Sequence, residues 1–275
     1  MKTVDRNTPA VGIDLGTTYS VVAYLDAQGH PETLVNAEGE RLTPSVVFFD
    51  DEEVIVGREA LKAFARLPER AAECSKRDVG YKVYHKVLQG KYYPPEVIEA
   101  YILNKLRQDA AQQIGDFSQV VITVPAYFDE VRRKATQDAG YMAGLDVMDI
   151  INEPVAAALA FAYEAGFLSE ASIPSRPERI LVYDLGGGTF DVTVMEIRGH
   201  EYVTLAIDGD VRLGGWDWDQ RLVDLVAEAI IREHGFDPRE DVRAWGKLWS
   251  LCEEAKRTLS VRPRATISFE YQGRT

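Results

Sequence analysis

The stretch that decides the fold is Val11-Gly12-Ile13-Asp14-Leu15-Gly16-Thr17-Thr18-Tyr19-Ser20-Val21-Val22-Ala23. Apolar residues flank an Asp-Leu-Gly-Thr-Thr segment, and this pattern predicts a β-hairpin, two strands joined by a glycine-rich bend. The backbone amides of such a bend can face an anion, and Gly16 lets the backbone come close to it. Asp14 either holds a hydrated cation beside that anion or merely caps a tight turn.

A second stretch repeats this pattern in the second half of the chain: Leu181-Val182-Tyr183-Asp184-Leu185-Gly186-Gly187-Gly188-Thr189-Phe190-Asp191-Val192-Thr193-Val194. The repeat favours two facing turns that together clamp phosphate groups. Asp14, Asp184 and Asp191 would then repel one another, and such crowding raises carboxylate pKa values. A divalent cation would relieve the repulsion. Because Mg²⁺ prefers oxygen ligands and keeps several waters, we expect the aspartates to hold it largely through water.

The composition excludes several classes of protein. The 275 residues carry a formal net charge of −13, which argues against a nucleic-acid partner because duplex binding needs a basic surface. No apolar run approaches the roughly 20 residues that cross a bilayer, so no membrane insertion is expected. Residues 1–10 lack the apolar segment of a signal peptide, so we expect a loose leader and a cytoplasmic protein. Cys74 and Cys252 are too far apart for a disulfide framework or a zinc site, and we expect buried thiols.

Periodicity predicts an α/β protein with two lobes. Residues 11–171 would form the first lobe and residues 180–275 part of the second, joined by a surface connection at residues 172–179. The predicted helices cover residues 96–114, 129–143, 154–166, 217–233 and 239–260. The predicted strands outside the two hairpins cover residues 44–49, 54–57, 118–124 and 266–271.

The phosphate-binding pattern is not a P-loop, because no segment has the form G-x-x-x-x-G-K-[ST] and the glycines at 186–188 do not open a helix. Phosphate loops on hairpins are typical of the superfamily of actin, sugar kinases and heat-shock ATPases. Within it, the chain resembles the N-terminal ATPase domain of the 70-kDa heat-shock (DnaK-type) chaperone family over about residues 11–270. The segments that carry the resemblance are Gly12–Ser20, Val124–Phe128, Ile151–Ala160, Asp184–Asp191, Gly209–Asp210 with Leu213–Gly215, and Cys252–Ser260.

This resemblance implies an actin-like ATPase fold, in which duplicated ribonuclease H-like lobes surround a nucleotide cleft. The stretch between Lys76 and Pro125 is shorter than in typical members, so the outer subdomain of the first lobe, about residues 50–117, is expected to be trimmed. The family's later segments have no counterpart, so we expect an incomplete second lobe, as in a fragment of a longer chaperone or a reduced natural form. An unfinished sheet would leave an open edge, a route to a homodimer.

The resemblance also assigns roles to residues. The catalytic set is Lys76, Glu153, Thr189 and Asp191, with Lys76 orienting the attacking water and the γ-phosphate. The metal set is Asp14, Asp184 and Asp191. Pro125 and Arg133 would relay the nucleotide state toward a peptide-binding domain. The nucleotide-binding set is Gly16, Thr17, Thr18, Tyr19, Gly186, Gly187, Gly188, Thr189, Gly214, Gly215, Glu253, Lys256, Arg257 and Ser260.

Several of these residues have a plainer alternative. Glu253, Lys256, Arg257 and Ser260 share one helix face, which touches adenosine in the resembling family, but Glu253 and Arg257 alone could be an ion pair on a solvated face. Lys76 alone could be a solvated lysine. Glu153 alone could be a helix-end carboxylate favoured by the helix dipole.

The function implied by the resemblance is ATP binding and slow hydrolysis to ADP with Mg²⁺, and with K⁺ as an additional ion. The implied partners are a J-domain co-chaperone, a nucleotide-exchange factor and unfolded peptides, the last bound by a domain that the sequence lacks. Three alternatives belong to other classes: an actin-like filament-forming ATPase, a small-molecule kinase of the same superfamily, and a regulator that binds nucleotide without hydrolysing it.

Overall fold

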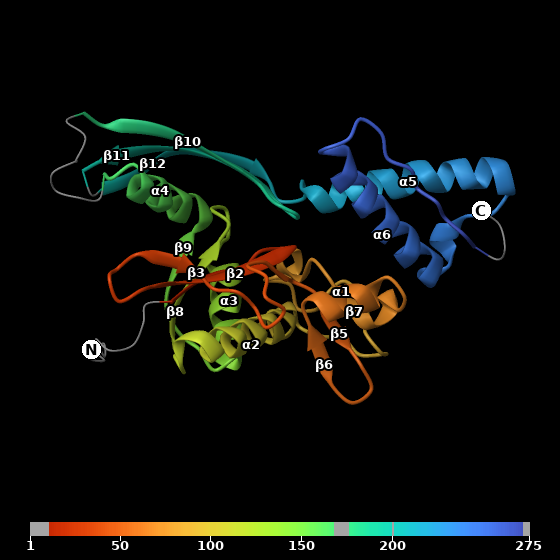
Figure 1. Ribbon diagram of the computed structural model, residues 1–275, viewed down its shortest axis with the longest axis horizontal. Coiled ribbons are helices and arrows are strands. Elements are labelled where there is room, and N and C mark those ends of the chain that lie inside the picture. The colour runs from red at the N-terminus through yellow and green to blue at the C-terminus, as the bar shows by residue number, and fades with distance from the viewer. Residues whose placement is uncertain (1–10, 168–175, 200, 272–275) are drawn as a thin grey trace.

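The largest sheet positions the first glycine turn. A computed structural model describes residues 11–167, 176–199 and 201–271 (Figure 1). Its largest sheet has the order β3-β2-β1-β8-β9, with β4 also paired to β2. The antiparallel pair β1–β2 is the predicted first hairpin, whereas β8 and β9 run parallel to β1. The strands are β1 Val11–Asp14, β2 Tyr19–Leu25, β3 Pro31–Thr33, β4 Thr43–Pro44, β8 Gln119–Val124 and β9 Asp146–Asn152.

Two helices pack against this sheet and bury the first core. They are α2, Pro95–Ile114, and α3, Glu130–Met142. The side chain of Asp129 accepts a hydrogen bond from the Arg132 amide and so caps α3. Apolar residues at helical spacing in α2 meet the apolar face of the sheet, and they include Ile98, Ile102, Leu103 and Leu106.

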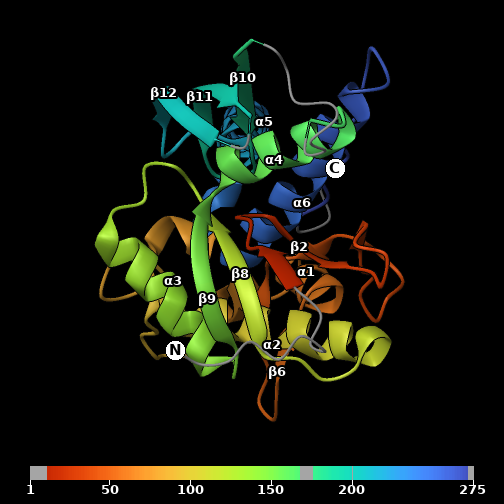
Figure 2. The same cartoon turned by 90° about the vertical axis from the view of Figure 1, so that its left-hand side faces the viewer.

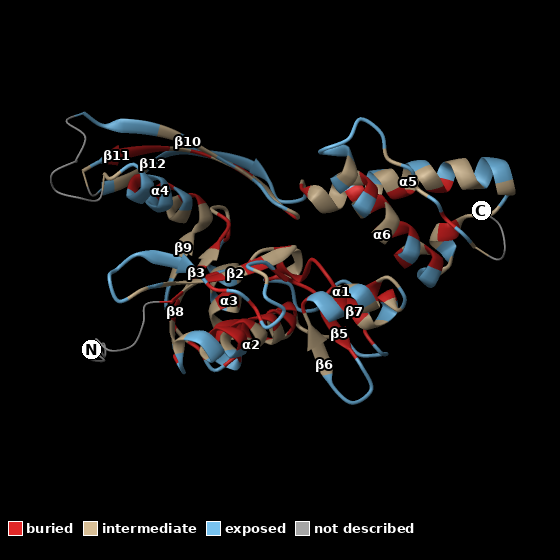
Figure 3. Cartoon of the chain, in the orientation of Figure 1, coloured by how far each residue is buried: buried red, intermediate tan, exposed pale blue. Residues whose placement is uncertain are grey.

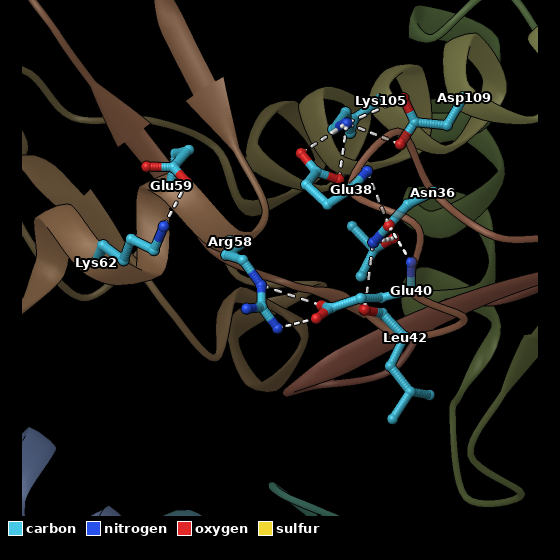
Figure 4. A network of polar contacts seen from close by, with 10 residues as sticks. Asn36, Glu38, Glu40, Leu42, Arg58, Glu59, Lys62, Lys105 and Asp109 are labelled. Carbon is cyan, nitrogen blue, oxygen red and sulfur yellow. Dashed lines mark hydrogen bonds and ion pairs between the residues drawn. The ribbon is translucent and has the colours of Figure 1, made fainter.

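A smaller unit lies beside this layer (Figure 1). It contains α1, Arg58–Phe64, and the three-stranded sheet β6-β5-β7. Side chains fasten the preceding loop to both helices, because Glu40 pairs with Arg58 of α1 and Glu38 pairs with Lys105 of α2 (Figure 4). The remaining elements of the unit are β5 Val47–Phe49, β6 Val54–Val56, β7 Ala71–Ala72 and the 3₁₀ turns η1 Pro68–Arg70 and η2 Ser75–Asp78.

The second hairpin belongs to a separate antiparallel sheet, β10-β11-β12. Helix α4, Glu153–Glu164, lies between this sheet and the largest sheet (Figures 1 and 2). The face of β10 away from α4 is exposed, since Leu181 and Tyr183 each keep 63% of their surface (Figure 3). The strands are β10 Glu178–Leu185, β11 Phe190–Arg198 and β12 Glu201–Asp210.

The last helices bring the two halves of the chain together. Helices α5, Gly215–His234, and α6, Val242–Leu259, flank the 3₁₀ turn η4, Pro238–Glu240. They share one buried apolar cluster with α1 and β5, in which Trp249, Leu248 and Val223 meet Phe64 and Phe48. The cluster joins segments that are far apart in the sequence, so apolar burial holds α5 and α6 against α1 and β5.

Most predicted elements are confirmed, including both hairpins, all five helices and the two buried thiols. The strand predicted at residues 266–271 is wrong, because only Tyr271 forms a bridge. Instead of joining a sheet, Ile267 and Phe269 pack into the apolar cluster of α5 and α6. Residues 1–10 and 172–175 of the expected leader and connection lie outside the described residues. None of the described helices has the length and apolar character needed to cross a membrane.

The core of the largest sheet can be tested with a matched pair of isoleucines. Ile122 in the central strand β8 is completely buried, whereas Ile207 in the edge strand β12 keeps 46% of its surface. We expect Ile122→Ala to lower the free energy of unfolding by about 3 kcal/mol through lost burial and a cavity, and Ile207→Ala to lower it by less than about 1 kcal/mol. Urea denaturation measures both values, and equal losses would contradict the assignment of the core.

Candidate functional site

The first turn is closed by its own side chains. The amide of Gly16 donates to Ser20 Oγ at 3.2 Å. A Cβ at Gly16 would lie 2.1 Å from the Tyr19 carbonyl oxygen, so only glycine allows this bend. Asp14, at the end of β1, accepts a hydrogen bond of 2.8 Å from Thr123 Oγ1 on β8.

The second turn packs directly against the first. A Cβ at Gly187 would lie 1.6 Å from Thr18 Oγ1, and one at Gly188 would lie 2.3 Å from Thr17 Cγ2. The backbones can approach in this way because these positions carry no side chains. The two predicted phosphate turns therefore lie in direct contact.

A third glycine segment leans on the second turn. Gly215 donates its amide to the Gly186 carbonyl at 3.1 Å, and Trp216 donates to the Gly187 carbonyl at 2.8 Å. A Cβ at Gly214 would lie 2.6 Å from backbone atoms of Gly187. The N-terminus of α5 is thus joined to the turn, and backbone amides from three segments gather at one place.

A cavity of about 420 Å³ lies between the turns. It brings together predicted residues from both halves of the chain and from the catalytic and metal sets. Its predicted lining residues are Asp14, Gly16, Thr17, Thr18, Tyr19, Lys76, Glu153, Asp184, Gly186, Gly187 and Thr189. Thr123, Ala156 and Ala157 complete the lining.

Lys76 and Glu153 form an ion pair inside this cavity, with Nζ and Oε1 2.5 Å apart. Lys76 belongs to η2 and is 6% exposed, and Glu153 begins α4. Burial lowers the pKa of Lys76, but the carboxylates of Glu153 and Asp14 outweigh it, so the pKa is raised and the ammonium stays charged. Burial also raises the pKa of Glu153, and Lys76 opposes that rise.

Two aspartates of the metal set, Asp14 and Asp184, line the cavity. Asp184 and Asp191 are cross-strand partners on β10 and β11. Burial raises the pKa of Asp184, with Asp14 adding to the effect, and burial with Glu153 and Asp184 raises the pKa of Asp191 to about 6. Asp191 is 1% exposed and is not among the residues that line the cavity; within the described residues, neither of its oxygens has a hydrogen-bond partner.

This donor set fits a hydrated cation. A buried carboxylate without a partner is unfavourable, and a nearby positive charge would relieve it. Across the described ranges, no group of three acidic, histidine or cysteine side chains could hold a metal ion directly. Mg²⁺ commonly keeps several of its waters, so Asp14, Asp184 and Asp191 suit binding through water.

A second cavity, of about 240 Å³, adjoins the first. Both cavities are lined by Thr17, Thr18, Tyr19 and Gly187. Three residues of the predicted adenosine face, Glu253, Lys256 and Arg257, also line the second cavity. Ser260, the fourth, is exposed at the end of α6 and lines neither of the two.

The side chains of this helix face are held by neighbours. Lys256 donates to Asp219 Oδ2 at 2.7 Å and to the Gly215 carbonyl at 3.0 Å. The guanidinium of Arg257 donates to the Tyr19 hydroxyl and lies 5.8 Å from the centre of the Tyr19 ring. Arg257 thereby links α6 to the first turn.

Three residues at the site were not predicted from the sequence: Arg77, Asp217 and Tyr127. Arg77 donates to the Gly188 carbonyl at 2.8 Å and forms a two-pronged ion pair with Asp217 at the start of α5. Tyr127 lies near Thr189 and Asp191, and burial raises the pKa of its phenol. Tyr127 belongs to the segment Val124–Phe128, which carries the resemblance, and Arg77 directly follows Lys76. Their contacts could not be predicted from spacing in the sequence, because the partner residues lie far away in the chain.

Pro125 and Arg133 lie at the edge of the site. Pro125 is buried directly after β8, and its carbonyl accepts from the Phe128 amide at 3.1 Å. Arg133 on α3 donates to the Phe128 carbonyl at 3.1 Å and to the Asn152 side chain. Since Asn152 precedes Glu153, Arg133 is connected to the start of α4.

The contact between the glycine segments can be tested without a ligand. We expect Gly214→Ala to lower the free energy of unfolding by about 1–3 kcal/mol, because its Cβ would push α5 away from the second turn. Gly12→Ala in β1 is the matched control, since no atom lies within 4 Å of its Cβ. Urea denaturation of both variants measures the difference, and equal stabilities would contradict the close packing.

Comparison with known proteins agrees with this geometry. The family model described as Hsp70 protein matches residues 10–90 and 81–275. Chaperone protein DnaK of Thermotoga petrophila is 44% identical over 265 residues, which cover 95% of this chain and 43% of that protein. Chaperone protein DnaK of Halobacterium salinarum is 42% identical over 262 residues, which cover 95% of this chain and 40% of that protein. The chain thus spans less than half the length of these relatives, and it belongs to the Hsp70 protein family.

Proposed function

We propose that this chain binds ATP with Mg²⁺ and hydrolyses it slowly, as the nucleotide-binding domain of a DnaK-like chaperone. The observation that carries the proposal is the cavity in which two glycine turns meet the buried Lys76–Glu153 pair. Turn amides, a fixed ammonium group and aspartates suited to a hydrated cation are the groups that phosphoryl transfer requires.

The two cavities suggest how the nucleotide lies. The phosphates would occupy the larger cavity, between the turns at Gly16–Thr18 and Gly186–Gly188. The adenosine would extend toward α6, where Glu253, Lys256 and Arg257 line the adjoining cavity. Arg257 is already packed on Tyr19, so its guanidinium is presented next to the first turn. A role for Ser260 stays a prediction.

Hydrolysis depends on placing a water in line with the γ-phosphate. Lys76 can donate to both the water and a phosphate oxygen, while Glu153 fixes the direction of the lysine. Thr189 lines the cavity at the same turn and can orient the γ-phosphate, with Asp191 behind it. Mg²⁺, when bound, would neutralise charge on the phosphate oxygens, and Asp14, Asp184 and Asp191 would hold it through water.

The wider function is proposed from membership of the Hsp70 family and from the position of the site. Each hairpin carries an aspartate in the last two residues of its first strand, Asp14 in β1 and Asp184 in β10, which supports duplicated lobes of actin-like fold. Arg133 connects α3 to the start of α4, which supports a relay from the cleft through Pro125 and Arg133. Coupling to unfolded peptides, a J-domain co-chaperone and a nucleotide-exchange factor would involve the whole protein. K⁺ as a second ion and a homodimer through the incomplete second lobe stay predictions.

The proposal is tested by the variant Lys76→Ala. We expect the single-turnover rate of ATP hydrolysis to fall by about 100-fold or more, because the variant loses a donor aimed at developing charge. ATP affinity should change much less, since the turns are intact. Lys105→Ala is the matched control, because Lys105 is partly buried but pairs with Glu38 and Asp109 far from the cavity (Figure 4).

The same preparation separates the alternatives. Parent and Lys105→Ala hydrolysing ATP without an added acceptor would oppose a small-molecule kinase. Sedimentation with ATP should leave the protein in the supernatant, whereas pelleted polymer would support a filament-forming ATPase. Binding of ATP with equally slow turnover in the parent and in Lys76→Ala would overturn the role of Lys76.

A further inference from the structure

A buried carboxyl group lies beneath the segment that carries Lys76. Glu99 is on α2 and is 1% exposed. Its Oε1 accepts a hydrogen bond of 2.8 Å from Ser75 Oγ, and Ser75 is itself 1% exposed. Oε2 is buried and has no hydrogen-bond partner within the described ranges. Neither the sequence motifs nor the geometry of the cavity gives Glu99 a role.

This position is unfavourable for a charged carboxylate. Removing an ion from water costs free energy unless a partner compensates it, and only one of its two oxygens is bonded. Burial raises the pKa of Glu99 to about 7, although Ser75 and Lys76 oppose that rise. Glu99 therefore changes its charge near neutral pH.

The charged group that acts on Glu99 is Lys76. Both groups that act on the carboxyl come from η2: the Ser75 hydroxyl and the charged Lys76. The sheet, β5 and α3 contribute the apolar side chains of the core around α2. Farther along α2, Lys105 and Asp109 pair with each other at 2.7 Å.

Two glutamates act on Lys76. Glu153 pairs with its Nζ inside the cavity, and the charge of Glu99 helps to raise the pKa of Lys76. Ser75, which Glu99 binds, is the residue next to Lys76 in η2. Cys74 before them has a φ of 55°, a left-handed conformation that is uncommon for residues other than glycine. Because η2 starts from this constrained residue, the anchor at Ser75 limits where Lys76 can point.

We propose that Glu99 is a positioning residue for Lys76, which anchors η2 through Ser75 and takes a proton from solvent when nucleotide phosphates enter the cavity. This inference rests on the proposed function, because it needs phosphate next to Lys76. Phosphate oxygens add negative charge near the lysine, which favours the neutral form of a neighbouring carboxyl. The proton comes from water or buffer and ends on the carboxyl of Glu99, and no other bond changes.

The first experiment needs no nucleotide. The thermal midpoint is measured from pH 5 to pH 9 for the 275-residue chain, for Glu99→Gln, and for Asp109→Asn as a matched buried carboxyl on the same helix. Because the pKa of Glu99 is raised in the folded chain, its contribution to stability is fully present below the ordinary glutamate pKa of 4.5 and is lost as pH rises from there to about 7. Glu99→Gln should therefore exceed the parent by roughly 4 °C or more at pH 8 and by little at pH 5.

Ser75→Ala separates titration from simple packing. This variant removes the hydrogen bond from Ser75 that favours the charged form of Glu99, so the pKa of Glu99 should rise. The fall in thermal midpoint should then extend to higher pH than in the parent. A purely structural role would lower the midpoint equally at every pH. Profiles of Glu99→Gln and Ser75→Ala that run parallel to that of the parent would overturn the proposal.

The second experiment measures protons during binding. ATP with Mg²⁺ is titrated calorimetrically at pH 7.5 in two buffers of different ionisation enthalpy. The parent and Asp109→Asn should take up roughly a quarter of a proton more than Glu99→Gln. Equal proton exchange in Glu99→Gln and the parent, with ATP bound, would overturn this inference and leave the proposed function standing. If the parent does not bind ATP, the proposed function and the phosphate-linked proton uptake both fail, and the pH profiles still decide whether Glu99 anchors and titrates.

Discussion

The structure depends on one close contact, that of the two glycine turns. Thr17 and Thr18 of the first turn occupy the space where side chains at Gly187 and Gly188 would stand. The contact fixes the separation of the two hairpins, and each hairpin has an aspartate in the last two residues of its first strand. The groups that line the larger cavity are therefore held in place by the backbones of the two turns, which have little freedom once both sheets are formed.

Such a contact also concentrates negative charge, so other interactions must hold the halves together. Arg77 does this beside the turns, because it binds the Gly188 carbonyl and Asp217 and lies over the Trp216 ring. Farther out, Phe64 and Trp249 belong to an apolar cluster shared by α1, β5, α5 and α6. Apolar burial is insensitive to the charge of the cavity, so it can offset repulsion among the carboxylates.

Local patterns in the sequence account for the hairpins and helices, since each depends on neighbours in the chain. The Asp-Leu-Gly bends predicted both turns, and Asp129 and Gly115 marked the ends of helices. The strands β3, β7, β9 and β12 and the helix α1 were not predicted. The contacts of Glu99 with Ser75 and of Arg77 with Asp217 could not be predicted, because they join residues that only the folded sheets bring together. The strand predicted at residues 266–271 is wrong because Ile267 and Phe269 pack into the cluster of α5 and α6, and that partner lies far away in the sequence.

The charge of the cavity constrains the order of events in the proposed reaction. Among the residues that line the larger cavity, Asp14, Asp184 and Glu153 outnumber the ammonium group of Lys76, and Asp191 lies buried next to Asp184. Burial is the main cause of the raised pKa values of Asp184, Asp191 and Glu153, and neighbouring carboxylates add to it. A polyphosphate entering alone would add more negative charge than the turn amides and one lysine could balance. Under the proposed function, the nucleotide must therefore arrive with its cation, and neutralisation of carboxyl groups around the cavity would assist its entry. Affinity at such a site depends on the metal ion and on pH as much as on contacts to the base.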